Sequence, residues 1–176
     1  MKDVELKALQ APLKERYRSR PETAVITLAA EGDIGEGVTC SVATATAMVR
    51  AGLHPATGGT GIHACSGDML LEALVACAGV TMNAVATALG YAIRSAHVRA
   101  EGDLDFRGTL GVDKEAPVGF RDIRLSFDID ADLSDEQHAT LLKLTERYCV
   151  VYQTLRKPPE VKVGISPITD VPRGDE

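Results

Sequence analysis

Tryptophan is absent from this 176-residue chain, and aromatic residues make up only 4% of it. Hydrophobic residues still account for 45% and charged residues for 25%, which is the composition of a soluble, packed domain. The core must therefore be built from Ala, Val, Leu and Ile, which suits close helix packing and a large contact with a second subunit. Repeats, linkers and low-complexity tracts are also lacking. We therefore predict one domain over residues 1–176, in which residues 1–20 form an N-terminal arm or a short helix.

The chain also lacks a basic stripe, and its formal net charge is -6 with a pI near 5.3. An acidic surface attracts neither nucleic acid nor anionic lipid, which excludes both as partners. The N-terminus has no positively charged region followed by an apolar one, so we expect no secretion signal and a cytoplasmic protein. The apolar run at residues 69–89 holds Glu72 and Asn83, which favours a buried helix of a soluble protein over a membrane span.

Alternating hydrophobic residues and turn residues predict five strands. Residues 23–30 and 38–49 are expected to form a first hairpin around a turn at residues 31–37. A second hairpin is expected from residues 98–112 and 121–130, joined through residues 117–119, and a last strand from residues 161–165.

Two helices accompany these strands. Ser66 offers an N-cap for the long apolar helix, Asp68 lies in its first turn, and Gly90 ends it. Ser134 and Gln137 form a capping box that opens a second helix ending near residue 148. This order of elements predicts an α+β fold with an antiparallel sheet packed on two helices.

Cys77 lies in the middle of the long helix, in a stretch from Cys65 to Gly90 whose only charges are Asp68 and Glu72. A helix that is apolar on nearly every face must be buried on nearly every side. Cysteine can serve there as a small hydrophobic residue. A buried thiol near a second thiol is, however, also the arrangement found in thiol peroxidases. The residues alone leave open whether Cys77 is a packing residue or a reactive thiol.

Cys149 follows the second helix, at a break where a helix terminus can depress the pKa of a thiol and mobility lets the sulfur approach another. Burial raises the pKa of a thiol, and a position in mid-helix removes the help of the helix dipole. A reactive Cys77 therefore needs a cation, for which the candidates are Arg16, Arg18 and Arg20. Cysteines in a reducing compartment are free or catalytic rather than structural.

A metal or phosphate site finds little support. Cys65, His63 and His54 form a loose cluster, but zinc requires about four ligands in a recognisable set, so we predict no metal and no cofactor. Cys65 is instead a candidate third redox thiol at a helix start, and Cys40 is expected in the core of a strand. The glycines at residues 58–61 lack the Lys-Ser/Thr of a P-loop, which favours a plain loop.

Taken together, these features resemble the OsmC/Ohr family of osmotically induced and organic-hydroperoxide-resistance proteins. The resemblance covers about residues 23–165 and depends on two motifs. One is the long apolar helix that carries Cys77 behind a glycine-rich loop, and the other is Cys149 in the sequence Glu-Arg-Tyr-Cys-Val-Val-Tyr-Gln-Thr-Leu. The resemblance implies an OsmC-like fold and an obligate, intertwined homodimer with long helices at its centre and two sites at the subunit interface.

The resemblance also implies roles for individual residues. Cys77 is the peroxidatic residue, and Cys149 is the resolving one, which condenses with the sulfenic acid of Cys77 to a disulfide. Arg20, just before the first expected strand, is the candidate for the activating arginine. Asp68 is either the residue that orients this arginine or a simple charge at a helix start, since family members usually have Pro and Glu there. Val150 replaces the proline that commonly follows the second cysteine.

We therefore expect a homodimeric, thiol-dependent peroxidase that reduces organic hydroperoxides and is recycled by an external dithiol, of the lipoyl type by resemblance. The alternative is a non-enzymatic protein of the same fold that binds a small apolar ligand or senses redox state. Two distant sulfurs, or the lack of an arginine near Cys77, would favour this alternative. Glu72 is either paired at the dimer interface or buried and protonated.

Overall fold

The computed structural model describes residues 4–5, 8, 10–12, 15, 19–20, 32–35, 39–43, 48–111 and 113–165, with the backbone alone at residues 32–35 and 39–43. The described residues before residue 20 are helical. The strand predicted at residues 23–30 lies outside the described residues, as do Arg16 and Arg18.

The first described sheet has four short strands: β1 (Gly32–Gly35), β2 (Thr39–Ala43), β3 (Met48–Gly52) and β4 (Ala64–Cys65). The first three are antiparallel neighbours, and β4 runs parallel to β3. The glycine-rich connection between β3 and β4 is a loop, as predicted, with one turn of 3-10 helix, η2 (Pro55–Thr57).

Two predictions for this region are wrong. Residues 31–37 are not a plain turn, because β1 runs through them and pairs with β2. Residues 38–49 are not one strand, because Val42 of β2 lies opposite Val49 of β3 and the chain reverses between them. Apolar and β-branched residues occur on both sides of this reversal, so composition alone did not reveal the break.

The long apolar helix is α2 (Ser66–Leu89), and it contains 24 residues. Its start was predicted one residue too late, because Cys65 rather than Ser66 is the N-cap and makes no side-chain capping bond. Asp68 does lie in the first turn. Gly90 ends the helix at φ 74°, a left-handed conformation that glycine adopts at little cost, and its N–H reaches the carbonyls of Ala86 and Thr87.

A separate antiparallel pair, β5 (Ile93–Leu104) and β6 (Phe120–Ala131), packs on α2. The prediction for β6 is confirmed, since alternate residues are partly buried and pack against the core: Ile123, Leu125, Phe127 and Ile129. The pairing of the two strands is confirmed as well, with Val98 opposite Phe127.

The predicted strand at residues 98–112 is wrong in its second half. β5 ends at Leu104, and a short helix, α3 (Phe106–Thr109), follows. Asp105 caps this helix, since its carboxylate accepts a hydrogen bond from the backbone N–H of Arg107 at 3.1 Å. Gly108 lets the helix approach the connection closely, because a Cβ there would lie 2.5 Å from the carbonyl oxygen of Pro117.

Two helices complete the described fold, α4 (Asp135–Tyr148) and α5 (Val150–Arg156). The capping box of α4 is confirmed. The Ser134 hydroxyl accepts from the N–H of Gln137 at 3.3 Å, and the Gln137 side chain accepts from the N–H of Ser134 at 2.8 Å. Such a cap contributes about 1 kcal/mol to helix stability.

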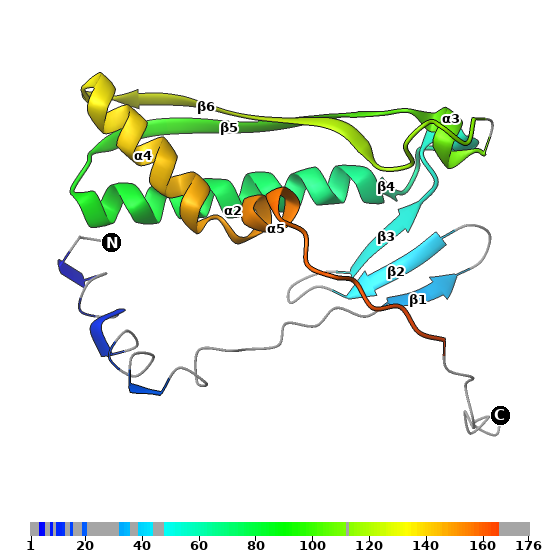
Figure 1. Cartoon of the computed structure of the whole chain (residues 1–176), viewed down its shortest axis with the longest axis horizontal. Coiled ribbons are helices and arrows are strands. Elements are labelled where there is room, and N and C mark those ends of the chain that lie inside the picture. The colour runs from blue at the N-terminus through cyan, green and yellow to red at the C-terminus, as the bar shows by residue number, and fades with distance from the viewer. Residues whose placement is uncertain are drawn as a thin grey trace.

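The core lies where α2 meets the β5–β6 pair, α4 and α5. Figure 1 shows β5 and β6 running along one side of α2, while α4 crosses it. The buried stripe of α2 recurs every fourth residue, at Leu74, Ala78, Met82 and Ala86. The fold is therefore α+β, with an antiparallel sheet packed on helices, as predicted.

The opposite side of α2 is exposed in this single chain. The exposed residues include Glu72, Ala76 and Val80, and Val80 is 73% exposed. The prediction that α2 is buried on nearly every side is therefore not met within one chain, and Glu72 is not buried here. α2 is long and apolar enough to cross a membrane by length and composition. Within the described structure it packs against β5, α4 and α5.

The predicted last strand at residues 161–165 is not formed in the single chain. The segment is irregular, and its alternating apolar residues Val161, Val163 and Ile165 are 79%, 89% and 98% exposed. A strand requires a neighbouring backbone to accept and donate its hydrogen bonds. The described part of the chain supplies no such partner to this segment.

Candidate functional site

Cys149 lies at the junction of two helices, as the sequence predicts. It is the C-cap of α4, with its N–H bonded to the carbonyl of Thr145 at 2.9 Å, and also the N-cap of α5, with its carbonyl bonded to the N–H of Gln153 at 2.9 Å. Its backbone is extended there, at φ -71° and ψ 109°. One residue therefore ends one helix and starts the next.

The junction places Cys149 against the middle of α2. Cys149 is 1% exposed and packs in a cluster with Leu74 and Ala78, and Cys77 borders the same cluster and is partly buried. Both thiols are free. The thiol of Cys149 donates a hydrogen bond to the sulfur of Cys77. Residues 72 positions apart in sequence thus form a thiol pair.

The two thiols have opposite pKa shifts. Burial raises the pKa of Cys77, but hydrogen bonds from the backbone N–H groups of Val151 and Val150, from the Cys149 thiol and from the Thr81 hydroxyl outweigh it. The net pKa of Cys77 is therefore lowered. Burial is the main cause that raises the pKa of Cys149, and its bond to Cys77 raises it further. Cys77 is the thiol that ionises first.

Three of these donors were missed by sequence reasoning: the N–H groups of Val150 and Val151 and the Thr81 hydroxyl. α5 begins at Val150, so the first N–H groups of that helix have no partner within it and are directed to the Cys77 sulfur. Thr81 lies four residues after Cys77 on α2, which places both side chains on the same face of the helix. That spacing is readable in the sequence, whereas the approach of α5 depends on tertiary packing.

An arginine was expected to lower the pKa of Cys77. Among the described groups that shift this pKa, none is an arginine. Arg20 is described as an exposed residue, and its role in activating Cys77 stays a prediction. Asp68 is nine residues before Cys77, so it lies about 14 Å away along the helix axis. It lines a cavity of about 400 Å³ together with Leu71, Val75 and other residues.

Cys65 and the nearby histidines do not converge. The Nδ1 atom of His54 accepts a hydrogen bond from the N–H of Ala56 at 3.0 Å, and its ring stacks on Phe106 with centroids 5.0 Å apart. His63 packs over Gly52. Within the described residues, no three His, Cys, Asp or Glu side chains gather as a metal site would require.

Comparisons with known proteins agree on one family. The family model described as OsmC-like protein matches residues 59–164. No curated protein matches the sequence. The matched segment includes both cysteines of the thiol pair and all of α2, α4 and α5.

Several solved structures share the fold. An OsmC-like protein from Mycoplasma pneumoniae has a TM-score of 0.63 at 18% identity, covering 76% of this chain and 89% of that chain. Two organic hydroperoxide resistance proteins each cover 76% of this chain and 91% of their own. The one from Elizabethkingia anophelis has a TM-score of 0.61 at 14% identity, and the one from Legionella pneumophila has 0.60 at 15%. At these identities the likeness establishes the fold.

Proposed function

The chain belongs to the OsmC-like protein family, and from that premise we propose that it is a thiol-dependent peroxidase that reduces organic hydroperoxides. The single observation that carries this proposal is the thiol pair, in which Cys77 has the lowered pKa and receives a hydrogen bond from Cys149. A low-pKa thiol beside a second thiol is what a two-cysteine peroxidase requires. Structures of the same fold are named organic hydroperoxide resistance proteins, which supports the substrate class.

The proposed cycle has three steps. The Cys77 thiolate attacks one peroxide oxygen, the O–O bond breaks, and the other oxygen leaves as an alcohol after taking a proton, so that Cys77 becomes a sulfenic acid. The Cys149 thiol then attacks the oxidised sulfur, a disulfide forms and water leaves. An external dithiol, which we propose to be of the lipoyl type, reduces the disulfide by thiol–disulfide exchange and is itself oxidised to a disulfide.

Arg20 and Asp68 keep their proposed roles in this scheme. Arg20 would supply positive charge to the Cys77 thiolate, in addition to the N–H groups of Val150 and Val151. Because Asp68 lies about 14 Å along α2 from Cys77, it would act on the arginine and not on the sulfur. An arginine contributed by a second subunit would satisfy the same requirement.

We propose that the protein acts as a homodimer in the cytoplasm. The uncovered face of α2 presents small and aliphatic side chains, among them Ala73, Ala76, Val80 and Ala84. An apolar helix face of this kind is stable in water only when another surface covers it. A second copy of α2 is a fitting cover, because small side chains allow two helices to approach closely. The exposed apolar residues at 161–165 support the same assembly, since a second copy supplies a sheet edge for them.

The test is disulfide mapping by mass spectrometry. The reduced protein receives one equivalent of cumene hydroperoxide, free thiols are alkylated, and peptides are analysed beside a Cys77→Ser control. We expect a Cys77–Cys149 disulfide within seconds in the unmodified protein and none in the control. Thiols that are still reduced after minutes would contradict the proposal and favour a non-enzymatic protein of the same fold.

A further inference from the structure

The carbonyl of Glu146 is the acceptor that an uninterrupted helix would give to the N–H of Val150, because an α-helix joins each N–H to the carbonyl four residues earlier. The backbone bonds on either side of this position follow that spacing. The N–H of Cys149 donates to Thr145 at 2.9 Å, and the N–H of Gln153 donates to Cys149 at 2.9 Å. Between residues 150 and 146 the described structure has no such backbone bond. The junction of α4 and α5 therefore leaves one N–H and one carbonyl to find other partners.

The N–H of Val150 is directed at the sulfur of Cys77 on α2. It takes this direction because the backbone of Cys149 is extended, at ψ 109°, which ends the helical path of α4 before α5 begins. A helical continuation of α4 would direct the same N–H back to Glu146. The contact with Cys77 thus depends on the break at Cys149.

The carbonyl of Glu146 is bound by the side chain of Gln153. The Nε2 group of Gln153 donates to this carbonyl at 2.7 Å, across seven residues of sequence. Gln153 is partly buried and is the fourth residue of α5. Its side chain therefore makes the bond that Val150 would make in an uninterrupted helix.

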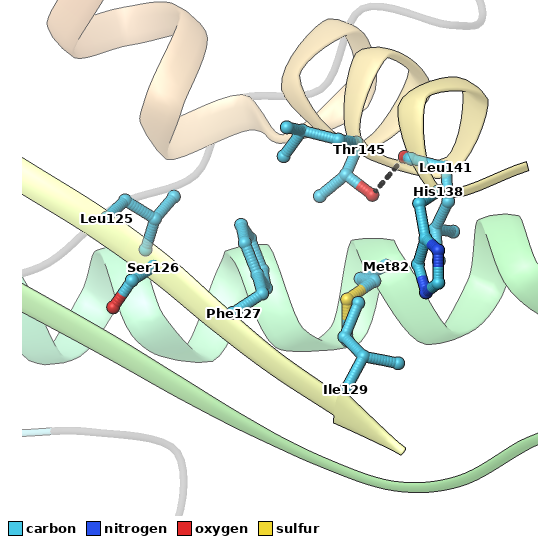
Figure 2. Close-up of a pocket in the computed structure, with 9 residues that line it drawn as sticks. Met82, Leu125, Ser126, Phe127, Ile129, His138, Leu141 and Thr145 are labelled. Atoms are coloured by element: carbon cyan, nitrogen blue, oxygen red, sulfur yellow. Dashed lines mark hydrogen bonds between the residues drawn. The ribbon is translucent and has the colours of Figure 1, made fainter. Parts of the chain in front are cut away.

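The last turn of α4 holds this acceptor in place. Thr145, the neighbour of Glu146, is 2% exposed, and its hydroxyl donates to the carbonyl of Leu141 at 2.8 Å, as Figure 2 shows. The carbonyl of Thr145 in turn accepts the N–H of Cys149. The Glu146 carbonyl therefore belongs to a packed, hydrogen-bonded helix end, and the bond from Gln153 ties α5 to it.

From this exchange of partners, we propose that Gln153 is a positioning residue for Cys77, because it occupies the Glu146 carbonyl and so leaves the Val150 N–H to the Cys77 sulfur. Without the amide, the Glu146 carbonyl regains the Val150 N–H as its helical partner, and the sulfur loses a donor. A donor to the sulfur favours the thiolate, which is the reactive form of cysteine. The consequence for turnover rests on the proposed peroxidase function, whereas the exchange of hydrogen bonds does not.

The pH profile of Cys77 alkylation tests the proposal without peroxide. Gln153→Met keeps the length of the side chain and removes its donor. Alkylation of Cys77 by iodoacetamide, followed by peptide mass spectrometry, should therefore slow about threefold below the midpoint of the profile and recover above it.

Thr154→Val is the matched control for this variant. The hydroxyl of Thr154 donates to the carbonyl of Val150 at 2.9 Å, so its removal also costs α5 one side-chain hydrogen bond. The Glu146 carbonyl stays occupied by Gln153 in this control, and the alkylation profile should be unchanged.

A second substitution shows whether Gln153 acts through Val150. Val150→Pro removes the N–H, and the fold accepts it because proline suits the first position of a helix and the extended backbone of Cys149 suits the residue before a proline. Alkylation should slow in this variant too. Gln153→Met should then add nothing further in the Val150→Pro background, since no N–H is left for the Glu146 carbonyl to regain.

Three results would overturn the proposal: an unchanged profile in Gln153→Met, an equal change in Thr154→Val, or additive effects of Gln153→Met and Val150→Pro. Disulfide mapping with peroxide separates these results from the proposed function. Slower alkylation in Gln153→Met supports the role of Gln153 even if peroxide forms no disulfide in the unmodified protein. A disulfide that forms while Gln153→Met alkylates normally leaves the peroxidase in place and removes the role of Gln153.

Discussion

The Cys149 thiol donates its hydrogen bond to the Cys77 sulfur, and this one contact stabilises the thiolate on Cys77 while holding the proton on Cys149. Burial opposes ionisation of both thiols and both receive backbone N–H donors from the start of α5, but only Cys77 gains a further donor from Thr81, and the contact between the two sulfurs lowers the pKa of Cys77 while it raises that of Cys149. The pKa values of the two thiols therefore differ before any peroxide reacts with them. The asymmetry matches the chemical order that a peroxidatic and a resolving cysteine require.

Replacement of Cys149 should separate the two steps of the cycle. In Cys149→Ser, we expect Cys77 still to react with cumene hydroperoxide, because its N–H donors on α5 are retained. The sulfenic acid should then persist, since no second thiol condenses with it. Trapping with dimedone and mass spectrometry should detect an adduct at Cys77, and turnover with a dithiol should fall strongly. Full turnover in this variant would assign the resolving role to another thiol, with Cys65 the next candidate.

Thr81 should tune the reactivity of Cys77. In Thr81→Val, the thiolate loses one hydrogen-bond donor, so the pKa of Cys77 should rise and the thiolate fraction at neutral pH should fall. The pH profile of alkylation by iodoacetamide should therefore move to higher pH, with slower reaction below the pKa and recovery above it.

The matched control for that variant is Thr87→Val. Thr87 is also on α2, but its hydroxyl donates to the carbonyl of Asn83 at 2.8 Å. Its replacement should leave the alkylation profile unchanged. An equal shift in both variants would mean that the effect comes from helix stability and not from the contact with the sulfur.

Leu74 should be a main contributor to stability around the thiol pair. It is 1% exposed and packs with Ala78 and Cys149. Leu74→Ala should lower the free energy of unfolding by about 2–5 kcal/mol, because a buried cavity replaces the side chain. Leu70→Ala, at a position that is 38% exposed on the same helix, should cost about 1 kcal/mol or less. Urea denaturation followed by circular dichroism compares the two, and similar losses would contradict the packing described for α2.

The exposed face of α2 should control assembly. Val80 is 73% exposed in the single chain, so Val80→Glu leaves the described core untouched. If a second copy covers this face, a carboxylate there is buried without a partner, which is costly enough to shift the protein toward monomer. Light scattering coupled to gel filtration should show a dimer for the unmodified chain and a smaller species for the variant. Val118→Glu, at a position that is 64% exposed in the connection before β6, is the control that should stay dimeric.

Local signals in the sequence predicted the elements that position the site. The capping box at Ser134, the glycine at position 90 and the alternation along β6 each act through neighbours in the chain, and all three are present as predicted. The alternation in residues 106–110 was misleading. It is interrupted by the cap at Asp105, which starts a helix where the pattern predicts a strand.

The features that sequence reasoning missed depend on contacts between distant segments. The donors from α5 reach Cys77 only because the α4–α5 junction packs on α2. A fully buried α2 and a strand at residues 161–165 both require a surface that the described part of the chain does not supply. A hydrophobic pattern indicates that a segment packs against another surface. It does not indicate whether that surface belongs to the same chain or to a second one.

Because Cys149 caps both α4 and α5, it is the residue about which one helix can rotate relative to the other. α5 is seven residues long, so Arg156 stands about 10 Å from Cys149. A disulfide requires its two Cα atoms to lie within a limited distance of each other. Any movement of the Cys149 backbone that brings its sulfur into bonding distance of Cys77 would therefore also rotate α5. A rotation of about 10° over that length moves the far end by roughly 2 Å, enough to make or break a hydrogen bond. A Cys77–Cys149 disulfide of the proposed cycle would therefore change the position of Arg156 at the far end of α5.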